Sequence, residues 1–312
     1  MAKNKITIVG AGNVGATTAF IAATKQLGSI VLLDVVEGLA EGKALDIAQA
    51  APVELYSSDI AGTRDWEKTA VSDIVIITSG LPRKPGMSRD DLLAKNFRIV
   101  KDVSEKAARY SPDSIIIIVC NPLDAMVYTA AKVTGFNKNK IIGMAGALDS
   151  ARFSYFLASE LNVDVEDVKC VLMGGHGDDM VPLPRFTSVG GIPISELLEE
   201  NKLNELIKRT RNGGIEIVNY LGYSAFYAPA SGTVKMAQAI LEDKKTVLSC
   251  CAYCENEYNV GGYFVGVPAV LGAKGVEKII ELNLNKEEMA QFEKSLGHVK
   301  ELTEKVDKLL SK

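Results

Sequence analysis

The sequence predicts an α/β protein in which an N-terminal doubly wound parallel sheet precedes a C-terminal α+β region. Two observations support this fold class. In residues 1–145, short runs of β-branched apolar residues alternate with helix-like segments, and each run is continuously apolar, as in strands buried on both faces of a parallel sheet. After about residue 149 the pattern changes to long helices and pairs of strands.

The strands and helices of the first half follow in order. Strands are expected over 5–9, 29–34, 73–78, 114–120 and 140–145. Helices are expected over 13–27, 38–50, 89–110 and 122–134. Their ends carry the expected stop signals Gly28, Pro52, Pro112 and Gly135. Strand, helix and strand at this repeat indicate a doubly wound half.

The second half should contain helices near 195–221 and 229–242 and an antiparallel group built from "KTVLSCCAYC" and "GYFVGVPAVLGAKGVEKII". A last helix is expected over about 286–310, where apolar residues recur at spacings of three and four. Asn285 and Glu288 resemble a capping box at its start. The chain therefore divides into residues 1–145 and 146–312.

The composition favours a soluble globular protein, with 47% hydrophobic and 24% charged residues. The formal net charge is −4, and no basic run exceeds Lys244-Lys245, which argues against nucleic acid or an anionic membrane as the main partner. Small anionic substrates remain possible through local arginines. No apolar stretch approaches the roughly 18–20 residues of a membrane span, so we expect a cytoplasmic protein.

The five cysteines are an odd number and lie in apolar runs, so no disulfide framework is expected. Cys251 and Cys254 could form half of a metal site or a redox pair. The segment around them looks like a strand, however, and residues three apart on a strand point to opposite faces. Buried small side chains are therefore the favoured interpretation, and no metal site is expected.

A glycine-rich turn follows the first expected strand and opens the first expected helix, with Gly10, Gly12 and Gly15 in the pattern GxGxxG. Such a turn lets backbone N–H groups and the helix N-terminus approach a pyrophosphate. Asp34 ends the second strand, where a carboxylate accepts hydrogen bonds from ribose hydroxyls and repels a 2′-phosphate. The alternative is a plain turn beside a structural aspartate. We predict a Rossmann site for NAD rather than NADP.

His176 is one of only two histidines and lies between Gly175 and Gly177. Hydride transfer between an alcohol and NAD needs a group that takes and returns the hydroxyl proton, and imidazole suits both tasks near neutral pH. The other histidine, His298, lies off the apolar stripe of the last helix. We expect His298 to be a solvated surface residue with no part in the chemistry.

Two charged residues could complete the site around His176. Asp149 and Arg152 lie three apart on an expected helix and so project from nearly one face. One could orient the histidine while the other pairs with a substrate carboxylate. Taken singly, Asp149 would more often be a helix cap and Arg152 a surface charge.

The segment "SGLPRKPGMSRDDLL", residues 79–93, contains two prolines and carries Arg83 and Arg89. It suits a lid that closes over substrate, excludes water and brings in positive charge. The alternative is a solvated loop with ordinary arginines.

These motifs, together with "VCNPLDAMVY", "GMAGALDSARF" and "MGGHGDDMVPLPRFTSVGGIP", resemble the lactate/malate dehydrogenase family over essentially the whole chain. The resemblance implies that His176 is the acid/base, Asp149 its partner and Arg152 the clamp on the substrate C1 carboxylate. It implies that Arg89 polarises the substrate carbonyl, that Asn121 binds substrate or orients the nicotinamide region, and that Ser224 lies near the pocket wall. The NAD-binding set that it implies is Gly10, Gly12, Asn13, Val14, Gly15, Asp34, Asn96, Val119 and Asn121.

The resemblance also implies a substrate. Malate-oxidising members have arginine where lactate-oxidising members have glutamine, and this position is Arg83 in "PRKPG". A second substrate carboxylate needs a partner if a closed lid desolvates it, whereas pyruvate would leave a buried guanidinium unpaired. We therefore expect reversible oxidation of (S)-malate to oxaloacetate by a homodimer or homotetramer.

Three alternatives stay open: an L-lactate or broad 2-hydroxyacid dehydrogenase, a non-catalytic NAD(H)-binding module, and a methyltransferase with a similar glycine loop. One position departs from the family pattern, because Asp179 stands where many relatives with "GGHGDTMVP" have threonine. The extra carboxylate could raise the pKa of His176 or point to solvent. We expect the second, because neighbouring side chains on an extended segment diverge.

Overall fold

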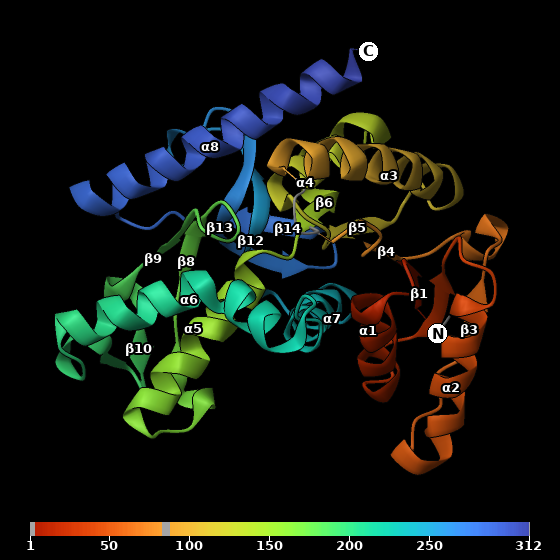
Figure 1. Ribbon diagram of the computed structural model, residues 1–312, viewed down its shortest axis with the longest axis horizontal. Helices are drawn as coiled ribbons and strands as arrows, with labels where there is room; N and C mark the ends of the chain where they lie inside the picture. Colours follow the sequence, from red (N-terminus) through yellow and green to blue (C-terminus); the bar gives the residue numbers. More distant parts are fainter. Residues whose placement is uncertain (1–3, 83–87, 312) are drawn as a thin grey trace.

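The computed structural model describes residues 4–82 and 88–311, and it confirms the predicted fold class (Figure 1). The parallel half contains β1 (Lys5–Val9), β2 (Ser29–Leu33), β3 (Ile60–Thr63), β4 (Ile74–Ile77), β5 (Ile115–Ile118) and β6 (Ile141–Gly143). These strands lie in the order β3-β2-β1-β4-β5-β6, and all their pairings are parallel. The chain steps outward from β1 in both directions, which defines a doubly wound sheet.

The antiparallel strands continue the same sheet. They are β8 (Leu172–Gly174), β9 (Met180–Pro182), β12 (Thr246–Cys254), β13 (Tyr263–Gly272) and β14 (Gly275–Ile279). The two parts join where Gly143 of β6 pairs with Cys251 of β12, so the described residues form one sheet of eleven strands. A small separate sheet contains β7 (Val168–Lys169), β10 (Ser188–Val189) and β11 (Ile192–Pro193).

Helices cover both faces of the parallel half. They are α1 (Asn13–Thr24), α2 (Leu39–Glu54), α3 (Arg89–Tyr110) and α4 (Leu123–Thr134). On β4, Ile74 and Ile76 pack in the core cluster that includes α1 and α2, whereas Val75 and Ile77 pack in the cluster that includes α3 and α4. Figure 1 shows α3 and α4 together on one side of these strands and α1 on the other. Burial on both faces explains the continuously apolar runs of the sequence.

The remaining helices are α5 (Gly146–Leu161), α6 (Glu200–Leu221), α7 (Tyr227–Leu241) and α8 (Lys286–Leu310). Short 3-10 turns occupy Trp66–Thr69, Lys138–Lys140, Val165–Asp167, Pro184–Phe186, Ile194–Glu196 and Glu257–Asn259. The predicted capping box of α8 is confirmed, because Asn285 and Glu288 each bond the backbone N–H of the other. Within the described ranges, no helix combines the length and the hydropathy needed to cross a membrane.

Local sequence signals misplaced two elements. Helix α2 runs through Pro52 to Glu54 instead of stopping at residue 50. A proline removes one N–H donor, and only two residues of α2 follow it, so the disruption is confined to the last turn. Strand β3 was not expected, because "IAGT" is short and has a single strongly apolar residue. It forms by pairing with β2 at the edge of the sheet.

Cys251 and Cys254 lie on opposite faces of β12, as predicted for residues three apart on a strand. Cys251 packs in the core cluster that includes α3 and α4, and Cys254 packs in the other. Burial raises the pKa of the Cys254 thiol to about 12, so it stays protonated near neutral pH. The two side chains therefore serve as small core residues.

Candidate active site

The glycine-rich turn joins β1 to α1 at the carboxyl edge of the parallel strands. A Cβ atom at Gly15 would lie 1.8 Å from the carbonyl oxygen of Gly10, so only glycine lets α1 approach the turn this closely. Gly12 is exposed and precedes α1 with no side-chain cap on the helix. The first backbone N–H groups of α1 are therefore available to a phosphate, which is the fit expected of a dinucleotide cradle.

Asp34 follows β2 and turns toward this cradle. Its Oδ2 accepts a hydrogen bond of 2.6 Å from the Ala11 N–H, and its Oδ1 accepts one of 2.9 Å from the Val36 N–H. Each carboxylate oxygen keeps a further lone pair for an incoming hydroxyl. The carboxylate is thus fixed beside the glycine turn with acceptor capacity left for a ribose.

His176 lies in the loop between β8 and β9, and Asp149 lies in the first turn of α5. Nδ1 of His176 and Oδ2 of Asp149 are 2.8 Å apart, and the Asp149 side chain is 2% exposed. Burial lowers the pKa of His176, but the Asp149 charge, its hydrogen bond and the Asp124 charge outweigh burial and raise it above its ordinary value. The pair fixes the tautomer so that Nε2 is free to exchange a proton.

Asp124 is a second buried carboxylate at the site, and sequence reasoning missed it. It lies in the first turn of α4, and its Oδ2 accepts a 3.1 Å hydrogen bond from the backbone N–H of His176. Burial raises the pKa of Asp124, while the N–H of His176 and the histidine charge oppose that rise. The only sequence signal was its place in "CNPLD", three residues after Asn121.

We predict that Asp124→Asn lowers the pKa of His176. The amide keeps an acceptor for the His176 N–H but removes a negative charge that favours the imidazolium. Oxidation of an alcohol by this site would need the neutral imidazole, so its rate should reach its plateau at lower pH in the variant. Reduction of the carbonyl would need the imidazolium, so its rate should decline at lower pH. Profiles of kcat/KM against pH in both directions measure the shift, and wild-type profiles in the variant would contradict it.

Arg152 projects from α5 one turn after Asp149, as its spacing predicted. Its Nη1 lies 3.6 Å from Oδ1 of Asp149, and its side chain is 14% exposed. Gly213 of α6 lies against the Arg152 side chain, where an added Cβ would stand 3.2 Å from Cδ. Within the described part of the chain, Nε of Arg152 has no hydrogen-bond partner. A buried, incompletely paired guanidinium is suited to a carboxylate ligand.

The other predicted site residues fall into different places. Arg83 lies outside the described residues, and of Arg89 only the backbone, at the start of α3, is described. Asn121 is exposed between β5 and α4, and Val119 is half-buried directly after β5. Ser224 is exposed in the turn between α6 and α7, and no described contact joins it to His176 or Arg152.

Asn96 does not offer its side chain to solvent. It is buried in α3, where its Oδ1 accepts from the Leu81 N–H and its Nδ2 donates to the carbonyl oxygens of Leu81 and Asn121. The amide therefore joins the segment that follows β4 to the segment that follows β5. Backbone groups occupy the amide, and a contact between Asn96 and the cofactor stays a prediction.

Asp179 makes a contact that its sequence position does not predict. Its side chain does not point freely to solvent, because its Oδ1 lies 2.7 Å from Nδ1 of His298 on α8. His298 is half-exposed, as predicted, but it is bound to the loop that carries His176. Residues 119 positions apart meet here, which a local pattern does not reveal.

Two family models cover nearly the whole chain. Residues 4–143 match the lactate/malate dehydrogenase NAD binding domain, and residues 146–311 match the lactate/malate dehydrogenase alpha/beta C-terminal domain. A curated relative from Rhodopirellula baltica, named malate dehydrogenase, is 55% identical over an alignment of 314 residues. The alignment covers 100% of this chain and 100% of the relative.

Solved structures agree with these matches. The apo malate dehydrogenase from Picrophilus torridus has a TM-score of 0.97 at 47% identity, covering 99% of each chain. The lactate dehydrogenase from Cryptosporidium parvum, complexed with lactic acid and nicotinamide adenine dinucleotide, has a TM-score of 0.95 at 39% identity, covering 98% of this chain and 99% of that one. Enzymes named for different substrates thus share this backbone, so the choice of substrate must depend on side chains.

Proposed function

The chain belongs to the lactate/malate dehydrogenase family, and we propose that the site around His176 carries out its reaction. The activity is the NAD-dependent, reversible oxidation of malate to oxaloacetate. The observation that carries the mechanism is the buried His176–Asp149 pair beside the incompletely paired Arg152. A proton carrier and a carboxylate clamp are the two groups that a 2-hydroxyacid needs at its reacting carbon.

His176 takes the proton of the malate hydroxyl at Nε2, and in the reverse direction returns it to the oxygen of the reduced carbonyl. Asp149 holds the ring through Nδ1 and stabilises the imidazolium as it forms. Arg152 binds the carboxylate next to the reacting carbon, which fixes the substrate relative to the imidazole. When bound, NAD supplies the hydride acceptor or, when reduced, the hydride donor.

Two arginines of residues 79–93 complete the proposal on sequence grounds. Arg89 polarises the substrate carbonyl, and Arg83 pairs with the distal carboxylate of malate or oxaloacetate. The Asn121 side chain orients the substrate or the nicotinamide region, and Ser224 contributes to the pocket wall. Sequence identity to relatives named malate dehydrogenase supports the assignment of Arg83 to a dicarboxylate.

The cofactor-binding residues in this proposal are Gly10, Gly12, Asn13, Val14, Gly15, Asp34, Asn96, Val119 and Asn121. The uncapped start of α1 would hold the pyrophosphate, and Asp34 would accept hydrogen bonds from the adenosine ribose. Asn96 would shape the cofactor site by holding the Leu81 and Asn121 backbones together.

We expect Asp34→Ser to weaken the preference for NADH over NADPH. The carboxylate supplies hydrogen bonds to the ribose and repels a 2′-phosphate, and serine removes the repulsion. The measurement is kcat/KM for NADH and NADPH with oxaloacetate in both proteins. An unchanged ratio would show that Asp34 lies elsewhere than at the ribose.

The substrate assignment is tested by comparing oxaloacetate with pyruvate under saturating NADH. We expect a clear preference for oxaloacetate in kcat/KM. A preference for pyruvate would favour the L-lactate or broad 2-hydroxyacid alternative. Tight NADH binding without turnover of either substrate would favour a non-catalytic NAD(H)-binding protein.

Assembly, location and domain division complete the proposal. Exposed apolar side chains lie along α2, at Leu45 and Val53, and along α6, at Ile215 and Tyr220, which supports a homodimer or homotetramer. Sedimentation velocity would measure the mass of the assembly.

We place the protein in the cytoplasm. We divide the chain after residue 145, since the parallel pairings end at β6 and α5 begins at Gly146.

A further inference from the structure

The loop that carries His176 rests on α8, far along the chain. The Ser295 hydroxyl accepts a 2.8 Å hydrogen bond from the Gly175 N–H and donates a 2.6 Å hydrogen bond to the carbonyl oxygen of Asp179. The Ser295 side chain is buried, so neither bond competes freely with water. One hydroxyl therefore ties together the two ends of residues 175–179, with His176 between them.

The contact between α8 and this loop is also tight. Gly174 has φ +80°, and a Cβ atom there would stand 2.5 Å from the Ser295 hydroxyl oxygen. A Cβ atom at Gly175 would stand 3.3 Å from Cγ2 of Val299, one turn after Ser295. The glycines before His176 therefore let the loop lie directly against α8, in addition to letting the chain turn.

His298 adds a second contact, three residues after Ser295 on the same helix. Nδ1 of His298 lies 2.7 Å from Oδ1 of Asp179. Helix α8 therefore holds Asp179 twice, by its backbone carbonyl through Ser295 and by its carboxylate through His298. An isolated pair this exposed contributes little to stability. Here it acts on a residue that Ser295 already fixes, so its effect is on the geometry of the loop.

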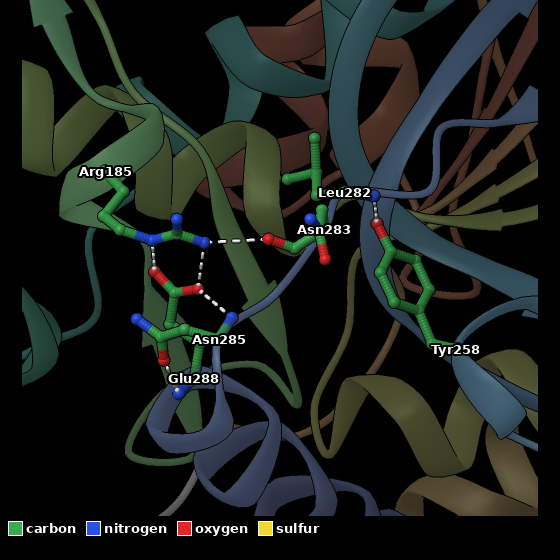
Figure 2. Close-up of polar contacts among 6 residues, drawn as sticks. All are labelled: Arg185, Tyr258, Leu282, Asn283, Asn285 and Glu288. Atoms are coloured by element: carbon green, nitrogen blue, oxygen red, sulfur yellow. Dashed lines mark hydrogen bonds and ion pairs between the residues drawn. The ribbon is translucent and has the colours of Figure 1, made fainter.

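Helix α8 is itself anchored, which makes it a firm support. Figure 2 shows the Arg185 guanidinium bridging both carboxylate oxygens of Glu288, each at 2.8 Å, and reaching the Asn283 carbonyl. Glu288 also accepts from the Asn285 N–H at the start of α8. Near the other end, Asp307 accepts from the Tyr128 hydroxyl of α4.

We propose that Ser295 and His298 are positioning residues for the acid/base, holding the loop so that the His176 imidazole meets the substrate at the correct distance. The proposal rests on the proposed function of His176. Asp149 orients the ring, Asp124 holds the His176 backbone, and α8 fixes the loop ends. Misplacement of a reacting group by about 1 Å can reduce a rate by about 10².

The test compares Ser295→Ala with Thr303→Val. Each variant removes one buried hydroxyl from α8, but among the described residues that of Thr303 bonds only the Val299 carbonyl of the same helix. We would measure the single-turnover rate of NADH formation with malate and with malate deuterated at C2. Because this rate constant does not depend on the active fraction of enzyme, loss of folded protein cannot imitate a positioning defect.

We expect Ser295→Ala to reduce the single-turnover rate about tenfold or more, with a retained isotope effect and an unchanged Kd for NADH. Thr303→Val should keep the wild-type rate constant. If Ser295→Ala lowered only thermal stability and kept the rate constant, Ser295 would be a purely structural residue and the proposal would fail.

His298 and Asp179 are tested as a pair, with His298→Gln, Asp179→Thr and the double variant. Each single change should reduce the single-turnover rate about threefold, and the double variant should be no slower than the slower single. If the rate losses of the two single variants added up in the double variant, or if neither single variant lost rate, His298 would be removed from the proposal.

Hydrogen exchange separates this proposal from the proposed function. The Gly175 amide should exchange at least about tenfold faster in Ser295→Ala than in wild type, because its acceptor is gone. Wild-type protein without malate turnover would refute the proposed function, whereas unchanged exchange at Gly175 would refute the anchoring by Ser295.

Discussion

Replacing His176 by asparagine is expected to lower kcat by roughly 10²–10⁴ while leaving NADH binding intact. Asparagine cannot take up and return a proton near neutral pH, and within the described residues the other histidine is bound to Asp179 instead. The measurements are kcat for oxaloacetate reduction and a fluorescence titration with NADH. Near-normal kcat in purified His176→Asn would rule out this histidine as the acid/base.

Asp149→Asn tests the other member of the His176–Asp149 pair. The amide keeps the shape of the side chain but removes the charge that stabilises the imidazolium, and its NH2 group can donate to Nδ1 of His176 and so favour the wrong tautomer. The variant should therefore be impaired in the same direction as His176→Asn. A wild-type rate in Asp149→Asn would mean that the 2.8 Å contact has no catalytic consequence.

Arg83→Gln is expected to reduce kcat/KM for oxaloacetate by at least about two to three orders of magnitude, on the order of 3–4 kcal/mol. A charge-assisted hydrogen bond contributes about 1.5–3 kcal/mol, and an unpaired carboxylate in a site drier than bulk water costs at least as much again. Activity on pyruvate should rise, because glutamine removes the guanidinium that a monocarboxylate leaves unpaired.

The decisive quantity is the ratio of kcat/KM for oxaloacetate to that for pyruvate, in wild type and in Arg83→Gln. Arg152→Gln is the control, since it should harm both substrates by removing a contact that all 2-oxoacids share. A wild-type ratio in Arg83→Gln would show that substrate choice lies at another residue.

The parallel half of the fold could be predicted because its signals are local. The continuously apolar runs marked every central strand, and the stop signals placed α3 and α4 within one residue of their observed bounds. The turn at Gly15 and the position of Asp34 follow from the same strand–helix pattern. Where tertiary packing overrides local signals, as at Pro52 and β3, prediction failed.

The contact between His176 and Asp149, the proposed catalytic pair, was predictable from chemistry, whereas the residues that hold the pair in place were not. His176 is one of two histidines and is set among glycines, and Asp149 shares a helical face with Arg152. Asp124, Ser295 and His298 act on the same loop through contacts between residues at least 52 positions apart. No periodic pattern encodes such contacts, so only the folded chain reveals them.

The pairing of Gly143 with Cys251 makes a single sheet out of the parallel half, which carries the glycine-rich turn, and the antiparallel half, which carries His176. Backbone hydrogen bonds cross the boundary, so the halves cannot swing apart about a hinge without breaking the ladder. Heat should therefore melt the cofactor end and the acid/base end as one cooperative unit. By mass action, NADH bound at the proposed site beside β1 and β2 would stabilise the distant strands β12 and β13 as well. Ligand occupancy at one edge then protects the whole molecule from unfolding and from proteolysis.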